Sequence, residues 1–113
     1  MTISELAEKI GANVVTPGVD LSREISSGYT CDLLSWVMAH GKEGMAWITV
    51  QTHMNVIAVA TLHDMACVII PEGIKVEEDV IKKADEEGVA VLTSFLTAYD
   101  IAGRMHDGGI AAM

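Results

Sequence analysis

The residues best placed to do chemistry gather in four short polar segments, each directly after a run of apolar or β-branched residues typical of a strand. In an α/β sheet, ligands bind beyond the carboxyl ends of the strands, where helix N-termini present free backbone N–H groups. The pattern therefore predicts a pocket for a small anion or a nucleotide, with Thr52, His53 and Asn55 donating hydrogen bonds. For Thr52 and Ser94 the alternative is ordinary helix N-capping, which Ser and Thr commonly perform. The four segments are residues 16–18, 51–55, 71–73 and 93–94.

Two arrangements of side chains could support catalysis. His53 and Glu72 follow neighbouring strands and would form an acid–base pair if the two side chains lay within hydrogen-bonding reach. Cys31 precedes a predicted helix, whose N-terminus can lower a thiol pKa, whereas Cys67 lies in the middle of a predicted strand and should be inert. Neither arrangement establishes an active site from sequence, so we predict no catalytic residue and a protein that is not an enzyme.

The motifs of metal and cofactor sites are absent from the sequence. The four histidines, at positions 40, 53, 63 and 106, have neither HxxxH nor HExxH spacing, and no CxxC accompanies them. Two cysteines cannot ligate an iron–sulfur cluster alone in the usual way. The chain also has no GxxxxGK[ST] loop and no GxGxxG fingerprint. We predict no metal and no cofactor, and a kinase or dehydrogenase of familiar type is not expected.

Composition restricts the partners of the chain. Its 113 residues suit one domain, and seven Lys and Arg against sixteen Asp and Glu give a net charge of −9. Binding to nucleic acid or to an anionic membrane surface needs a basic surface, so neither is expected. The sequence shows no secretory signal and no apolar stretch long enough to span a bilayer, and we expect a cytoplasmic protein.

The elements that must position the polar segments alternate between short strands and helices. Thr2 and Glu5 form a capping-box pattern before the first helix. Thr30 or Asp32 is expected to cap the second helix. Thr52 is expected to cap a helix over 54–62, and Ser94 a final helix with Phe95, Leu96, Tyr99, Ala102 and Met105 on its apolar side. Strands are predicted at 13–15, 46–50, 66–70 and 89–92, and a charged helix between the last two begins near residue 77.

This alternation predicts an α/β fold: a small three-layer, Rossmann-like domain with a mainly parallel sheet and helical crossovers. We expect residues 1–106 to form the single domain and the Gly/Ala-rich residues 107–113 to form a flexible tail. The helix over 54–62 is apolar on nearly every side, and the chain holds seven methionines. Because a domain this small has limited interior, the surplus of apolar surface favours a homodimer.

Several strings of the sequence resemble the stand-alone DRTGG-domain proteins over nearly the whole chain. The most specific is WITVQTHMN at 47–55, and Gly28-Tyr29, the DLLS string at 32–35, IIPEG at 69–73 and LTS at 92–94 accompany it. Together with the strand-end rule, the resemblance nominates ten ligand-binding residues: Gly28, Tyr29, Asp32, Gln51, Thr52, His53, Asn55, Gly73, Thr93 and Ser94.

The resemblance implies a small α/β domain similar to the amino-terminal domain of HPr kinase/phosphorylase. Similar domains accompany CBS domains or sit within regulated pyrophosphatases and phosphotransacetylases, which implies a regulatory, dimerising or nucleotide-sensing module without catalysis of its own. Only Gly73 matches the glycine pair that the family carries after the fourth strand region, and Glu72 in the other place would repel an anion. The alternatives are an accessory protein that contacts a redox enzyme such as an iron hydrogenase, and a small hydrolase or transferase.

Overall fold

The computed structural model describes residues 1–113, which form five strands and five helices. None of the helices is both long enough and apolar enough to cross a membrane. In chain order the elements are α1 (Ile3–Lys9), β1 (Asn13–Val14), β2 (Ser27–Thr30), α2 (Leu34–His40), β3 (Met45–Ile48), α3 (Met54–Leu62), β4 (Cys67–Ile70), α4 (Glu78–Glu87), β5 (Ala90–Thr93) and α5 (Ala98–Asp107).

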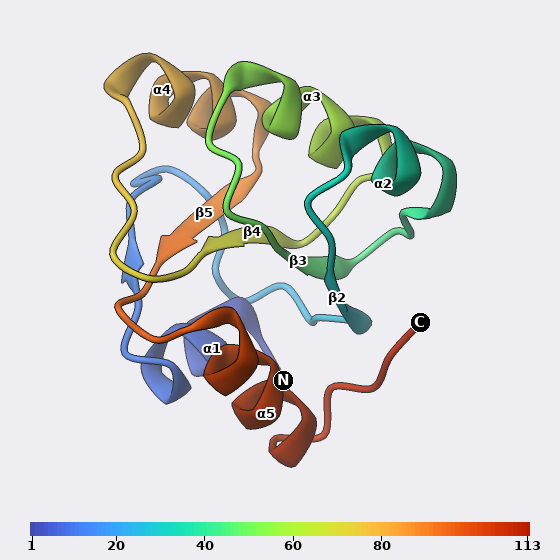
Figure 1. The fold of residues 1–113 in the computed structure, drawn as a ribbon. Coiled ribbons are helices and arrows are strands. Elements are labelled where there is room, and N and C mark those ends of the chain that lie inside the picture. The colour runs from blue at the N-terminus through green and yellow to red at the C-terminus, as the bar shows by residue number, and fades with distance from the viewer.

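The strands form one sheet in the order β1-β5-β4-β3-β2. The four strands β2 to β5 are parallel, and the short edge strand β1 pairs antiparallel with β5. Helices α2, α3 and α4 cover one face, while α1 and α5 cover the other (Figure 1). This arrangement confirms the predicted α/β fold with its mainly parallel sheet and three layers.

The core consists of two apolar clusters, one on each face of the sheet. Alternate residues of a strand point to opposite faces. Ile48, Ile69 and Leu92 therefore pack towards α1 and α5, whereas Trp47 and Val68 pack towards α2, α3 and α4. Both faces of β3 and β4 are fully covered, which explains why these strands are apolar at every position.

Helix capping agrees with the sequence at α1 and differs at α2 and α3. The Thr2 side chain accepts from the Glu5 N–H, and the Glu5 carboxylate accepts in return, so the capping box is confirmed. The predicted cap at Thr52 is wrong, because the His53 side chain occupies that position. Leu33 precedes α2 without a side-chain cap, so neither Thr30 nor Asp32 serves there.

The last helix begins later than predicted. Ser94 is no cap: its hydroxyl donates to the Ile10 carbonyl at 2.8 Å, and Thr97 caps α5 instead. Residues 94–97 are therefore a loop. Phe95 and Tyr99, which we expected on the apolar side of the helix, are 85% and 91% exposed.

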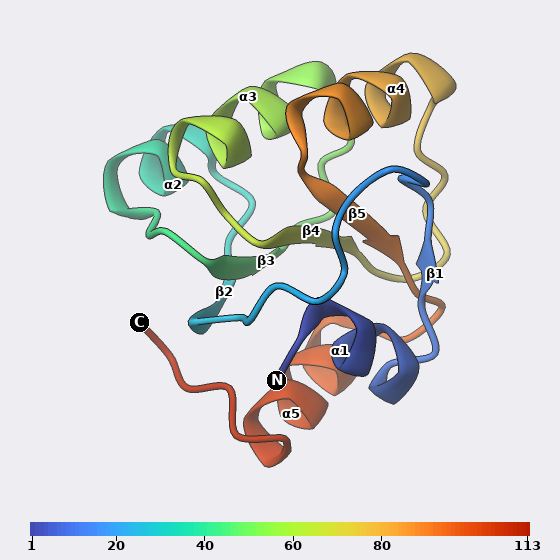
Figure 2. The same cartoon turned by 180° about the vertical axis from the view of Figure 1, so that it is seen from behind.

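The carboxyl-terminal residues 108–113 run back along the β2 edge of the sheet (Figure 2). Ile110 is buried, and the Gly28 N–H donates to the Ala111 carbonyl at 2.9 Å. Helix α5 itself extends through Asp107. The segment thus gives the edge strand β2 a partner, while its expected flexibility stays a prediction.

Candidate ligand-binding site

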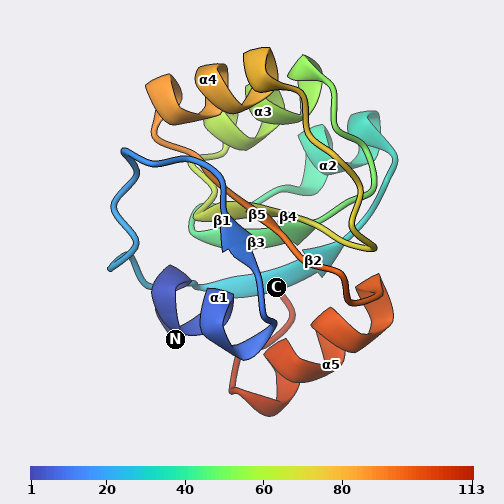
Figure 3. The ribbon, with the colours of Figure 1, turned by 90° about the vertical axis from the view of Figure 1, so that its left-hand side faces the viewer.

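The carboxyl ends of β2, β3, β4 and β5 lie along one edge of the sheet, and the loop after each strand leads into a helix. The loops after β2, β3 and β4 all lead to helices on the same face. The loop after β5 leads to α5 on the opposite face, so the chain diverges there from the β4–α4 loop (Figure 3). A crevice between diverging loops is where α/β sheets bind ligands.

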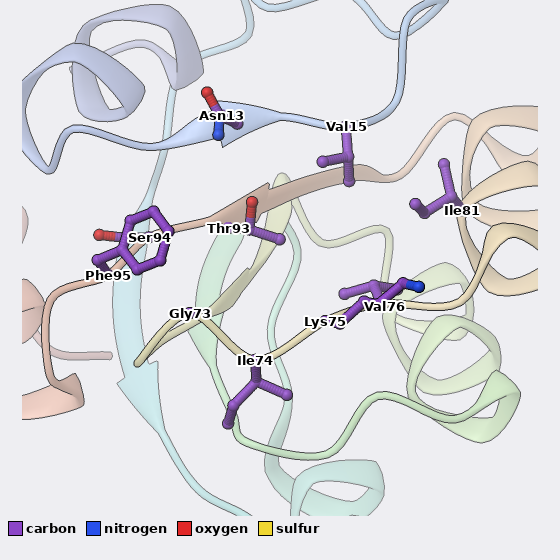
Figure 4. A pocket seen from close by; sticks show the side chains of 10 residues that line it. All are labelled: Asn13, Val15, Gly73, Ile74, Lys75, Val76, Ile81, Thr93, Ser94 and Phe95. Carbon is purple, nitrogen blue, oxygen red and sulfur yellow. The ribbon is translucent and has the colours of Figure 1, made fainter.

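A pocket of about 260 Å³ opens at this divergence. Its volume lies just below the usual range of small-molecule sites. Aliphatic side chains from the β4–α4 loop, α4 and the β1 edge form much of its wall, and four polar side chains join them (Figure 4). The lining residues are Asn13, Val15, Gly73, Ile74, Lys75, Val76, Ile81, Thr93, Ser94 and Phe95.

Three polar side chains of this pocket have no partner within the protein. Asn13 and Thr93 lie directly opposite each other in the β1–β5 register, and neither side chain makes a hydrogen bond. The exposed Lys75 forms no ion pair. An amide, a hydroxyl and an ammonium group are therefore free to bind a ligand. Ser94 differs, because its hydroxyl is used by Ile10 and by the Leu96 N–H.

The two loops that border the pocket are joined by their backbones. The Glu72 N–H donates to the Leu96 carbonyl at 2.8 Å, and the Gly73 N–H donates to the Ser94 carbonyl at 2.9 Å. These amides are therefore occupied and do not form a phosphate-binding turn. The ring of Phe95 lies against Gly73, where an added Cβ would meet ring carbons at 2.8 and 2.9 Å.

The predicted cluster after β2 and β3 does come together, but its members bind one another. The Asp32 carboxylate accepts from the Thr49 hydroxyl at 2.8 Å and from the Val50 N–H at 2.9 Å. The Gln51 side-chain amide donates to the Asp32 carbonyl, and its oxygen lies 3.1 Å from Nε2 of His53. The cavity beside Gln51 measures only about 10 Å³, which is room for about one water.

The remaining members of this cluster do not open it to a ligand. Nδ1 of His53 accepts from the Asn55 N–H at 3.3 Å, so both ring nitrogens have partners within the same loop. Thr52 borders the small cavity but caps no helix. A ligand role for Asp32, Gln51 and their neighbours stays a prediction.

Gly28 and Tyr29 lie at a third place. They line a recess of about 300 Å³ on the α5 side of β2, together with residues of α5 and of the carboxyl-terminal segment. The ten nominated residues therefore divide among three regions, of which the β4–β5 pocket holds Gly73, Thr93 and Ser94.

The side chains considered for catalysis are not arranged for it. His53 and Glu72 do not hydrogen-bond to each other. Cys67 is fully buried, and burial raises the pKa of its thiol to about 12, so it stays protonated at neutral pH. The half-buried Cys31 directs its sulfur towards the Leu33 carbonyl. No three His, Cys, Asp or Glu side chains converge to hold a metal ion.

Comparison with known proteins identifies the family. The family model for the DRTGG domain matches residues 5–107. The chain belongs to the DRTGG domain family. No curated protein sequence matches it significantly.

A solved structure shares the fold of this DRTGG domain. It contains the CBS and DRTGG domains of the regulatory region of Clostridium perfringens pyrophosphatase, complexed with the activator diadenosine tetraphosphate. The two structures align with a TM-score of 0.70 at 11% identity, over 92% of this chain and 45% of the other. This DRTGG domain therefore spans less than half of that chain, and the activator belongs to that region as a whole.

Sequence reasoning nominated three of the ten lining residues, and Asn13, Lys75 and Phe95 are among those that it missed. Asn13 reaches the site only because β1 pairs with β5, a register that single-sequence patterns do not show. The sequence pattern predicts Phe95 on the apolar side of a helix, whereas it lies in the loop before α5. For Lys75 a signal existed, since it is the first basic residue after the strand end at Ile70.

Proposed function

We propose that this DRTGG domain is a non-catalytic regulatory module that binds a small ligand in the pocket between the β4–α4 and β5–α5 loops. The observation that carries the proposal is the set of unpartnered polar groups on Asn13, Lys75 and Thr93 beside an aliphatic wall. The related pyrophosphatase supports it, because the regulatory region that contains its DRTGG domain binds an activator.

Ligand binding at this place would connect elements that are far apart in sequence. The pocket takes residues from β1, the β4–α4 loop, α4, β5 and the loop after β5. A ligand that binds only the folded state stabilises it by about 2.7 kcal/mol at a concentration one hundred times its Kd. Occupancy would thereby hold β1, α4 and the loops after β4 and β5 together, and an attached domain or partner could respond to this change.

Thermal unfolding with a panel of nucleotides and small organic anions tests this function. We expect at least one compound to raise the Tm, and Lys75→Met or Thr93→Val to reduce the rise. His53→Ala is the matched control, because His53 lies outside the pocket, in the loop after β3, where both of its ring nitrogens have partners. A Tm rise that His53→Ala removes and Lys75→Met leaves intact would contradict the placement.

We also propose that the domain forms a homodimer through α2 and α3. Neither helix contains Asp, Glu, Lys or Arg, although the chain carries a net charge of −9. Trp36, Met38 and Leu62 are 52%, 51% and 66% exposed there. Two acidic chains meet on this face without opposing like charges, and they cover apolar side chains that no intramolecular element covers.

Sedimentation velocity at micromolar concentration tests the dimer. We expect a dimer for the native chain and a monomer for Leu62→Lys, with Tyr99→Lys as the control at an exposed position on the opposite helix layer. A native chain that is monomeric would contradict the dimer. A monomer that forms a stable complex with a purified redox enzyme would instead favour the accessory role.

A further inference from the structure

Phe95 is an aromatic ring held at the surface of the pocket. It is the only phenylalanine of the chain, and it is 85% exposed. One side of the ring lies against Gly73, and two backbone hydrogen bonds fix the loops on which these residues lie. The contact and the hydrogen bonds restrain the ring while most of it faces solvent. A restrained ring with an open face is suited to stack on a planar heterocycle.

Lys75 supplies the only positive charge among the residues that line the pocket. The chain around it is acidic, with Glu72 three residues before it and Glu77, Glu78 and Asp79 two to four residues after it. One ammonium group in such surroundings pairs with one phosphate, whereas the repulsion grows with each further phosphate of a polyphosphate. The charge distribution therefore favours a ligand that carries a single phosphate.

The size of the pocket sets a second limit. A volume of about 260 Å³ lies just below the usual range for sites of drug-sized ligands. It suits one base and its sugar, and both halves of a dinucleotide would not fit. The free amide of Asn13 and the free hydroxyl of Thr93 can hydrogen-bond to a base edge or to ribose hydroxyls.

We propose that this pocket binds a purine mononucleotide, with its base stacked on Phe95 and its phosphate paired with Lys75. The inference rests on the proposed function, because it names the ligand class of the same site. It goes beyond that function by specifying one base, one phosphate and the Phe95 ring on which the base stacks.

Isothermal titration of the full chain with AMP, GMP, adenosine and ATP tests the proposal. We expect AMP or GMP to bind more tightly than ATP. Phe95→Leu should weaken the mononucleotide roughly 5- to 150-fold, the range of one lost base–aromatic stack. Lys75→Met should weaken AMP about fivefold and leave adenosine unchanged, since adenosine has no phosphate.

Matched control variants distinguish the loss of a pocket side chain from the loss of any exposed aromatic or lysine side chain. Tyr99→Leu removes another exposed aromatic side chain, and Lys82→Met removes an exposed lysine of α4 that has no ion pair. Both controls should leave AMP affinity unchanged. Unfolding curves of all four variants confirm that they fold, which is expected because each substituted side chain is exposed.

The outcomes distinguish this proposal from the proposed function. It is overturned if none of the four probes binds, or if Phe95→Leu and Lys75→Met bind AMP as tightly as the native chain. If the nucleotides fail while another compound raises the Tm in a manner that depends on Lys75, the mononucleotide is wrong and the ligand-binding function stands. If no compound of either experiment binds, both are wrong.

Discussion

The two ends of the carboxyl edge of the sheet have the same polar character in the sequence and opposite properties in the fold. At the β2–β3 end, Asp32, Thr49, Gln51 and His53 hydrogen-bond to one another and leave a cavity of about 10 Å³. At the β4–β5 end a pocket of about 260 Å³ stays open, and the side chains of Asn13, Thr93 and Lys75 have no partner. We refer to them as the closed end and the open end.

The difference follows from the faces on which the next helices lie. The loops after β2 and β3 both lead to helices on one face, so they run side by side and their side chains meet. The loops after β4 and β5 separate towards opposite faces and leave space between them (Figure 3). Polar side chains after a strand are therefore left without partners here only where the loops separate.

The first prediction compares thiol reactivity, because Cys31 lies at the closed end and Cys67 lies in the sheet. Cys67 is fully buried, so iodoacetamide should reach it only through global unfolding. For a stability of at least about 5 kcal/mol, its labelling should be slower than that of an unfolded chain by ~10³-fold or more. The half-buried Cys31 should react at least about a hundredfold faster than Cys67. Mass spectrometry of timed samples at pH 8 measures both, and equal rates would contradict the assigned burial.

The raised pKa of the Cys67 thiol predicts a loss of stability at alkaline pH. Folding raises the pKa of Cys67 from 9.0 to about 12. The contribution of the protonated thiol to the free energy of unfolding is therefore fully present below pH 9 and is lost as pH rises towards 12. Urea unfolding at pH 8 and pH 10 should therefore show a larger fall for the native chain than for Cys67→Ala. Equal falls would mean that the thiol does not contribute.

The second prediction breaks the closed end. Asp32→Ala removes the acceptor of the Thr49 hydroxyl and the Val50 N–H, and Thr49 is only 1% exposed. A buried donor without a partner costs about 2 kcal/mol of unfolding free energy. Asp32→Asn keeps one acceptor oxygen, so its free energy of unfolding should fall by less. Urea denaturation measures both, and ligand affinity at the open end should not change. Weaker ligand binding by Asp32→Ala at full stability would move the site to the closed end.

Sequence reasoning predicted the strands, the helices and the polar segments at the strand ends, because local hydrophobic patterns carry that information. Strands β3, β4 and β5 and the capping box at Thr2 follow from such patterns. The choice between the two ends depends on tertiary structure. His53 and Gln51 look as available in the sequence as Lys75 does, and only the packing of the loops shows which polar atoms are already satisfied.

The third prediction disturbs the aromatic platform without breaking the fold. Gly73 has a φ of +68°, so Gly73→Ala strains the backbone by about 1 kcal/mol, and the new Cβ pushes the Phe95 ring aside. Because that ring is exposed it can move, and the stability loss should equal that of Gly88→Ala. Gly88 has a φ of +75° and nothing near its added Cβ. Ligand affinity should fall for Gly73→Ala alone. Equal affinity in both variants would show that the ring position does not matter.

The last prediction is the smallest and concerns Glu72, which stands in the place of one glycine of the family's pair. Glu72 holds a φ of +59°, a left-handed conformation that costs about 1 kcal/mol for residues with a Cβ. Glu72→Gly relieves this strain. Glycine also raises the conformational entropy of the unfolded chain, which offsets about half of the stabilisation. We expect a net stabilisation of about 0.5 kcal/mol, which would raise the Tm by about 2–4 °C. Glu72→Ala removes the same charge and keeps the Cβ, so it should not be stabilised. If the two variants are equally stable, the charge and not the backbone determines the effect, and the open end stores no conformational strain.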